Sequence, residues 1–235
     1  MRLKSFGCSF IFGTELGDEA GDTPGAGYKH YSKLTWAAHL SQHLNATYEC
    51  YAKPGAGNLQ ILENILNQAS NRDDHNLFVI GWTWIDRFDY YNSRSKLLWE
   101  DWSTIMPVDE TETAKVYYRD LHSEYRDKFT CLSYIKLAID TLKQKNIPFI
   151  MTYIDDLIFD QRWHTTPAVI DLQEYVQPYM TTFDNHTFID WSKKNGYPIT
   201  KLGHPLEAAH AAAGDYIIKV FDKQNINGQA QWILF

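Results

Sequence analysis

A serine near the start of the chain and a histidine near its end have the side chains needed for acyl transfer. Ser9 lies in the run Gly-Cys-Ser-Phe at residues 7–10, and His204 stands directly before Pro205. A serine hydroxyl becomes a nucleophile when a histidine within hydrogen-bonding reach accepts its proton. The pair therefore predicts an acyl-transfer site if the fold brings the two side chains together.

Two glycine turns can supply the hydrogen-bond donors that such a reaction requires. One is the run Gly-Ala-Gly-Asn at residues 55–58, and the other is Gly-Trp-Thr at residues 81–83. Backbone N–H groups that point at the developing oxyanion lower the barrier to acyl transfer. Nucleophile, base and donors are therefore all represented in the chain.

The elements that must position these residues can be read from the hydrophobic pattern. Strands are expected at residues 3–8, 47–51, 77–80, 147–154 and 187–190, and helices at residues 31–44, 59–69, 111–145 and 205–223. This alternation is typical of an open, mainly parallel sheet with helices on both faces. The chain is therefore predicted to be an α/β protein with three α/β/α layers, as in flavodoxin-like folds, and a single domain over residues 1–235.

The predicted sheet explains how residues far apart in the sequence can meet. Ligands of such sheets bind at the carboxyl ends of the strands, where the connecting loops gather. Ser9 follows the first expected strand, the two glycine turns follow the second and third, and His204 precedes the last helix. We expect these segments at one edge of the sheet.

Composition excludes several other functions. The 235 residues are 44% hydrophobic and carry a net charge of −7, which argues against a nucleic-acid or anionic-membrane binder. No apolar run reaches the length of a membrane span and no signal peptide is evident, so the protein is expected in the cytoplasm. The three cysteines form no CxxC pair, and the glycine turns lack the third glycine of a dinucleotide fingerprint. No cofactor or metal is predicted.

The order of these motifs resembles that of the SGNH/GDSL hydrolase family. Residues 7–10 are similar to the opening GDS(L) motif, with Cys8 in place of the usual aspartate, and His204 with Pro205 is similar to the family's HP pair. The resemblance implies that Ser9 is the nucleophile and His204 the general base, with the N–H groups of Ser9 and Gly57 holding the oxyanion. It spans nearly the whole chain.

Two positions depart from the family pattern. The family carries aspartate three residues before the histidine, where this chain has Lys201, which cannot accept the Nδ1–H bond that orients the imidazole. Either the site is a Ser–His dyad, or Asp190, Glu207 or a backbone carbonyl substitutes. The family's oxyanion asparagine is replaced by Thr83, so the missing amide is expected from Asn58, or the hole is formed differently.

An aromatic-rich excursion over residues 82–110 is the expected substrate-contacting surface. Trp82, Trp84 and Arg87 begin it, and aromatic faces can stack on sugar rings while a guanidinium binds an anionic group. The alternative is that these rings pack in the core or form a contact between subunits of an oligomer. The oligomeric state does not follow from the sequence.

The sequence is therefore compatible with two functions. The first is a serine esterase or deacylase that acts on small-molecule or glycan O-acyl esters, including O-acetyl carbohydrates. The second is a non-catalytic carbohydrate-binding or structural protein on the same fold. The short Phe-Gly-Cys-Ser-Phe opening is similar to that of phage and viral members of the family, so the second function includes a virion-associated role.

Overall fold

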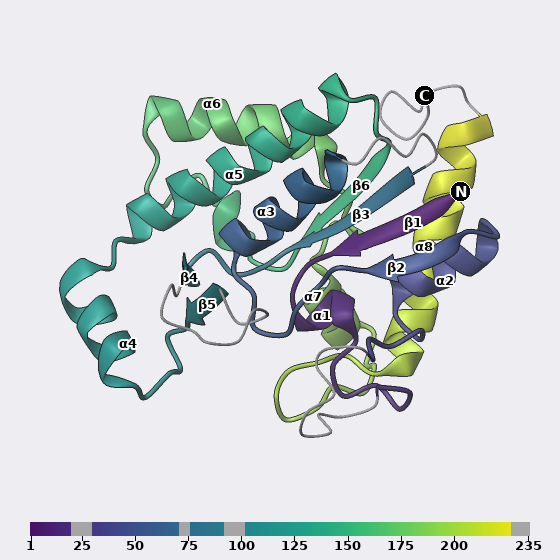
Figure 1. The fold of residues 1–235 in the computed structure, drawn as a ribbon, viewed down its shortest axis with the longest axis horizontal. Helices are drawn as coiled ribbons and strands as arrows, with labels where there is room; N and C mark the ends of the chain where they lie inside the picture. The colour runs from purple at the N-terminus through teal and green to yellow at the C-terminus, as the bar shows by residue number, and fades with distance from the viewer. Residues whose placement is uncertain (20–29, 71–75, 92–101, 227–235) are drawn as a thin grey trace.

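A four-stranded parallel sheet forms the centre of the protein. The computed structural model describes residues 1–19, 30–70, 76–91 and 102–226. The sheet contains β1 (Arg2–Phe6), β2 (Thr47–Cys50), β3 (Asn76–Trp82) and β6 (Phe149–Tyr153), in the order β2-β1-β3-β6 (Figure 1). Four of the five expected strands are confirmed.

The central strand β3 shows why this sequence forms a sheet that is covered on both faces. All seven of its residues are buried. Leu77 and Val79 pack in one apolar cluster, whereas Phe78 and Ile80 pack in the other. Because successive side chains of a strand point to opposite faces, a continuous apolar run is stable only between two helical layers.

Helices supply those two layers. On one side lie α2 (Trp36–His43), α7 (Phe188–Lys194) and α8 (Glu207–Ile226), and on the other lie α3 (Asn58–Ala69), α5 (Glu124–Gln144) and α6 (Pro167–Val176) (Figure 1). Three short helical elements lie in the connections, namely the four-residue α1 (Ser9–Phe12) and two 3-10 turns (Asp156–Ile158 and Gln177–Tyr179). The predicted three-layer α/β/α architecture is confirmed.

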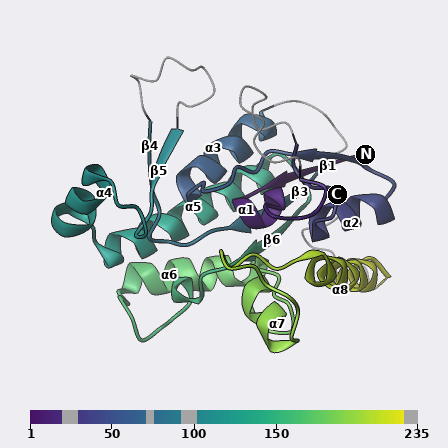
Figure 2. The same ribbon diagram turned by 90° about the horizontal axis from the view of Figure 1, so that it is seen from below.

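The 82–110 excursion contains a β-hairpin. Strands β4 (Phe88–Tyr91) and β5 (Trp102–Ile105) are antiparallel, and they are followed by α4 (Glu112–Val116) and a π-helical turn (Tyr117–Leu121). Figure 2 shows the hairpin on the side of the molecule that carries α4 and α5, away from α8. Residues 92–101 lie outside the described ranges. Within those ranges, no helix is long and apolar enough to cross a membrane.

The fifth expected strand, at residues 187–190, is wrong. Thr187 is instead the N-cap of α7, and its hydroxyl accepts a hydrogen bond from the N–H of Asp190. Threonine is favoured at this position because its side chain satisfies an N–H group that has no partner within the helix. The cap therefore overrides the short apolar pattern.

The expected helix at residues 111–145 is two helices. The backbone becomes extended at His122, with φ −63° and ψ 140°, and α5 begins after Ser123. The Ser123 hydroxyl accepts a hydrogen bond from the N–H of Arg126, so a serine cap restarts the helix. Two caps, at Thr187 and Ser123, thus account for both errors.

The buried histidine of α8 predicts acid sensitivity. His210 accepts a hydrogen bond from the N–H of Trp36, and burial lowers its pKa from 6.5 to about 3. Between these pH values the unfolded chain binds more protons than the native protein, so stability falls as pH falls. We expect the His210 contribution to decline by up to about 1.4 kcal/mol per pH unit across this window.

The matched variant is His210→Asn, which keeps an acceptor near the position of Nδ1 but does not titrate. Urea denaturation at several pH values from 7 to about 4 measures the free energy of unfolding for both proteins. The wild-type curve should fall more steeply than that of the variant. Parallel curves would contradict a neutral buried His210.

Candidate active site

The turn after β1 places Ser9 at the start of a short buried helix. Ser9 is the first residue of α1, Cys8 is its N-cap, and Ser9 is 7% exposed. The turn requires a glycine before it, because a Cβ on Gly7 would lie 2.6 Å from Cγ1 of Ile11 and 2.9 Å from the carbonyl oxygen of Gly81. The turn before Ser9 is therefore packed closely against Ile11 of α1 and Gly81 of β3.

Ser9 is the first member of a continuous chain of hydrogen bonds. Its hydroxyl lies 2.9 Å from Nε2 of His204. Nδ1 of His204 lies 2.6 Å from Oε2 of Glu15, and the same carboxylate oxygen accepts the hydroxyl of Thr200 at 2.6 Å. With the proton assigned to Nδ1, the imidazole donates to Glu15, and Nε2 is left to accept from Ser9.

The electrostatics of Glu15 suit this arrangement. Hydrogen bonds from Thr200 and then His204 lower the pKa of the Glu15 carboxyl below its usual value. The carboxylate form is therefore the one that faces the imidazole. A carboxylate in this position orients the ring and stabilises the imidazolium that forms when serine loses its proton.

The acid beside His204 is therefore Glu15, not Asp190 or Glu207. Asp190 accepts from the hydroxyl of Thr187 at the start of α7 and pairs with Lys193. Glu207 accepts the N–H of Gly17 at 2.8 Å. Glu15 was not predicted from the sequence, because the family pattern places the acid close to the histidine and the alternatives considered were Asp190 and Glu207. Its closeness to Ser9 in the sequence was the available signal.

The N–H of Gly57 already has a partner within the protein. It donates to Oδ1 of Asp89 at 3.0 Å, and the N–H of Gln60 donates to Oδ2 at 2.9 Å. Asp89 approaches so closely that a Cβ on Gly57 would lie 2.6 Å from either carboxylate oxygen. A carboxylate from β4 therefore binds the start of α3, where the oxyanion donor was expected.

Asn58 is likewise committed to the protein framework. Its amide nitrogen donates to the carbonyls of Thr83 and Trp84 at 3.1 and 3.2 Å, and its Oδ1 accepts the N–H of Thr83 at 2.9 Å. This side chain ties the end of β3 to the start of α3. The hydroxyl of Thr83 is buried and has no hydrogen-bond partner among the described residues.

The three expected substrate-contacting residues separate into two groups. Trp82 is 0% exposed and packs in the apolar cluster with α3 and α5, so its assignment to a binding surface is wrong. Trp84 is half-buried with its ring 5.6 Å from that of Phe10, and the Arg87 guanidinium lies 4.7 Å from the centre of the Trp84 ring. Phe10 also contacts the His204 ring, so Trp84 is separated from His204 by one ring. Arg87 lies beyond Trp84, and its guanidinium donates to the carbonyl of Ala56 at 2.8 Å.

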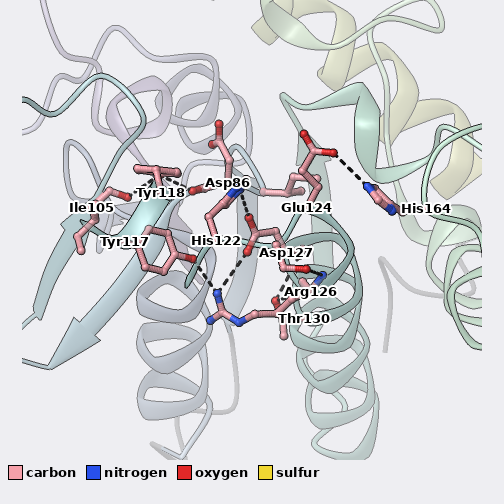
Figure 3. A network of polar contacts seen from close by, with 12 residues as sticks. Asp86, Ile105, Tyr117, Tyr118, His122, Glu124, Arg126, Asp127, Thr130 and His164 are labelled. Carbon is pink, nitrogen blue, oxygen red and sulfur yellow. Dashed lines mark hydrogen bonds and ion pairs between the residues drawn. The ribbon is translucent and has the colours of Figure 1, made fainter. Parts of the chain in front are cut away.

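Asp89 belongs to the hairpin, which is part of the insertion between β3 and α5. A second polar network holds the π-helical turn of this insertion. Nε2 of His122 lies 2.9 Å from Oδ2 of Asp127, and Arg126 donates to the Tyr117 hydroxyl at 2.7 Å (Figure 3). The hydroxyl of Tyr118 donates to the carbonyl of Asp86. Burial raises the pKa of Asp127 and of Asp86.

These contacts fix the hairpin and the π-helical turn against α5. Four residues of the network line a cavity of about 250 Å³, namely Asp86, Tyr118, His122 and Asp127. Ser9, His204 and Glu15 are not among the residues that line it. In the described part of the chain, no three His, Cys, Asp or Glu side chains are grouped as metal ligands. The contacts join the π-helical turn to α5 and to the segment before β4, so the network supports the insertion.

Solved structures with a similar fold are ester hydrolases. An acetyl xylan esterase (Est2A) from the rumen bacterium Butyrivibrio proteoclasticus matches with a TM-score of 0.51 and 14% identity, over 98% of this chain and 64% of that chain. A lipolytic protein of the G-D-S-L family from Veillonella parvula matches with a TM-score of 0.49 and 14% identity, over 94% of this chain and 98% of that one. The psychrotrophic esterase EstA from Pseudoalteromonas sp. matches with a TM-score of 0.49 and 10% identity, over 94% and 97%.

Neither a family model nor a curated protein sequence matches the chain. The likeness is therefore one of fold, at identities of 10 to 15% among the structures compared. The protein has the α/β fold of the SGNH/GDSL hydrolases in a divergent form. The resemblance expected from the order of the sequence motifs is confirmed at the level of the fold.

The capping role of Asp89 can be tested by stability. Asp89→Ala leaves the N–H groups of Gly57 and Gln60 without their acceptor in a site that is 6% exposed. Leaving buried donors unpaired costs about 1–3 kcal/mol. Asp89→Asn keeps one acceptor oxygen and should lose less. Urea denaturation compares the two variants, and equal stability of Asp89→Ala and wild type would contradict the capping role.

Proposed function

We propose that the protein hydrolyses carboxylic O-acyl esters, with Ser9 as the nucleophile and His204 as the general base. The observation that carries this proposal is the 2.9 Å separation between the Ser9 hydroxyl and Nε2 of His204, with a carboxylate on the other ring nitrogen. The fold, which is that of known ester hydrolases, gives independent support. Serine and base within hydrogen-bonding distance are the recurring signature of nucleophilic acyl transfer.

The geometry permits a two-step reaction. The Ser9 oxygen attacks the ester carbonyl carbon while its proton passes to Nε2 of His204. The tetrahedral intermediate then collapses, and the alcohol leaves with that proton, so that an acyl-serine remains. Water attacks the acyl-serine with His204 again as base, and the carboxylic acid is released.

Stabilisation of the oxyanion is the weaker part of the site. The N–H of Ser9 lies in the first turn of α1 and has no hydrogen-bond acceptor among the described residues. The N–H of Gly57 and the amide of Asn58 are occupied by protein acceptors. Because one missing oxyanion donor costs about 10²–10³ in rate, we propose a slow hydrolase.

The substrate class proposed is an O-acylated carbohydrate. Trp84 is half-buried and is linked to His204 through the Phe10 ring, and Arg87 lies over the Trp84 ring. Aromatic faces bind the apolar faces of sugar rings, and guanidinium groups supply several hydrogen-bond donors. That a structure with the same fold is an acetyl xylan esterase is in line with this class.

The second candidate is a non-catalytic binding protein on this fold, including a virion-associated one. The observation that favours it is the engagement within the protein of two of the expected oxyanion donors, Gly57 and Asn58. Such a protein would retain ligand binding through Trp84 and Arg87 without turnover. The two candidates differ in whether Ser9 is activated.

Covalent labelling tests activation of Ser9. We expect a fluorophosphonate probe to modify Ser9, because the phosphorus centre is attacked as an ester carbonyl would be. Labelling should be absent in Ser9→Ala and at least about 10³-fold slower in His204→Ala. Mass spectrometry of the modified peptide identifies the site. A folded wild-type protein that is not labelled, and that binds glycans equally well as Ser9→Ala, would establish the binding candidate.

Trp84 should affect the substrate more than the nucleophile. We expect Trp84→Leu to raise KM for an acetylated oligosaccharide roughly 2- to 10-fold, as for the loss of an aromatic contact of about 0.5–1.5 kcal/mol. The rate of labelling of Ser9 by a small fluorophosphonate should change little. Tyr125→Leu, which removes an exposed ring on α5, is the control. An unchanged KM in Trp84→Leu would remove this residue from the binding surface.

A further inference from the structure

The acid of the candidate site comes from an unexpected part of the chain. Glu15 lies six residues after Ser9, in the turn that follows α1, and Lys201 stands where the family resemblance implies an aspartate. Oε2 of Glu15 nevertheless receives both Nδ1–H of His204 and the hydroxyl of Thr200, each at 2.6 Å. Thr200 in turn accepts the N–H of His204 at 3.1 Å, so acid and base are joined twice.

The backbone at Glu15 is held in a conformation that a non-glycine residue rarely adopts. Its φ is +68°, in the left-handed region. Such a conformation persists only where the surroundings impose it. The N–H of Glu15 donates to Oε2 of Glu19 at 2.6 Å, and Leu16 is buried with 2% exposure. The strained turn therefore holds the Glu15 carboxylate toward Nδ1 of His204.

Further contacts tie this turn to both neighbouring elements. The N–H of Gly17 donates to Oε1 of Glu207 at the start of α8, at 2.8 Å. Asp18 accepts the N–H of Lys33 at 2.7 Å and also the hydroxyl of Ser32, before α2. The turn that carries Glu15 is thus fastened to the helix that follows His204.

We infer that Glu15 is the positioning residue that orients His204, so that the site is a Ser9–His204–Glu15 triad with its acid supplied from the nucleophile's side of the chain. The inference rests on the proposed ester hydrolysis. Glu15 holds the proton on Nδ1, keeps Nε2 directed at Ser9, and stabilises the imidazolium after proton transfer. Glu207 acts only through the turn, by holding Gly17.

The decisive variant is Glu15→Gln, which preserves shape and removes the charge. Its amide can donate to Nδ1 and so stabilise the wrong tautomer, as an aspartate-to-asparagine change does in serine proteases. We expect kcat for a small acetyl ester to fall roughly 10³–10⁴-fold with KM nearly unchanged. Asp190→Asn, which removes the carboxylate at the start of α7, should keep wild-type activity. Similar kcat values for Glu15→Gln and wild type would overturn the inference.

A second measurement reports on the hydrogen bond without turnover. In protein labelled with ¹⁵N-histidine, the Nδ1–H proton of His204 should resonate far downfield because it donates to a carboxylate. The signal is assigned by its absence in His204→Asn, and it should move upfield or vanish in Glu15→Gln. If it stays in place in that variant, Glu15 does not orient His204.

Relocating the acid provides the positive test. Lys201→Asp in the Glu15→Gln background places a carboxylate three residues before His204, and we expect at least a 10-fold recovery of kcat. No recovery, together with an unmoved Nδ1–H signal in Glu15→Gln, would overturn the inference. Failure of the wild type to react with the fluorophosphonate would instead refute the proposed hydrolysis. The displaced Nδ1–H signal would still support the role of Glu15, so the two failures are distinguishable.

Discussion

The pairing of β1 between β2 and β3 is the constraint on which the rest of the structure depends. Arg2 to Phe6 align in parallel with residues 76–80 on one side and residues 47–50 on the other, so all three strands end at the same edge. The burial of both faces of β3 fixes this register, because a shift by one residue would turn its side chains to the opposite layers. Gly7 then allows α1 to pack against Gly81, and Ser9 has little freedom left. The position of Ser9, the proposed nucleophile, is thus a consequence of the sheet.

The hairpin is also anchored at this edge of the sheet. Asp89 of β4 satisfies the start of α3 and also accepts the Thr104 hydroxyl from β5 at 2.6 Å. Burial raises the pKa of Asp89 although these hydrogen bonds oppose the shift. A buried carboxylate needs such donors, and here it takes the N–H of Gly57. The contact that anchors the insertion therefore occupies a backbone group that the proposed hydrolysis would use to bind the oxyanion.

The sequence was informative where a pattern is local. The strands of the sheet were predictable because each is a short apolar run, and Ser9 and His204 were singled out by their order relative to those strands. Thr187 and Ser123 misled the prediction because a single hydroxyl cap outweighed the apolar periodicity around it. Trp82 misled it because a fully buried tryptophan and a ligand-contacting one look alike in a sequence. Contacts between distant segments, such as Asp89 with Gly57, leave no local pattern at all.

The place of the acid follows from the same reasoning. The proposed hydrolysis requires a carboxylate on the Nδ1 side of His204, and any segment that reaches that side can supply one. The turn over residues 200–204 contributes Thr200, which bonds both to the backbone of His204 and to the carboxylate of Glu15. Thr200 thus holds a carboxylate that comes from another segment, and the 200–204 turn does not need an acidic residue of its own. An exposed lysine at position 201 is then compatible with the proposed triad, because the carboxylate at Nδ1 of His204 is that of Glu15, six residues after Ser9.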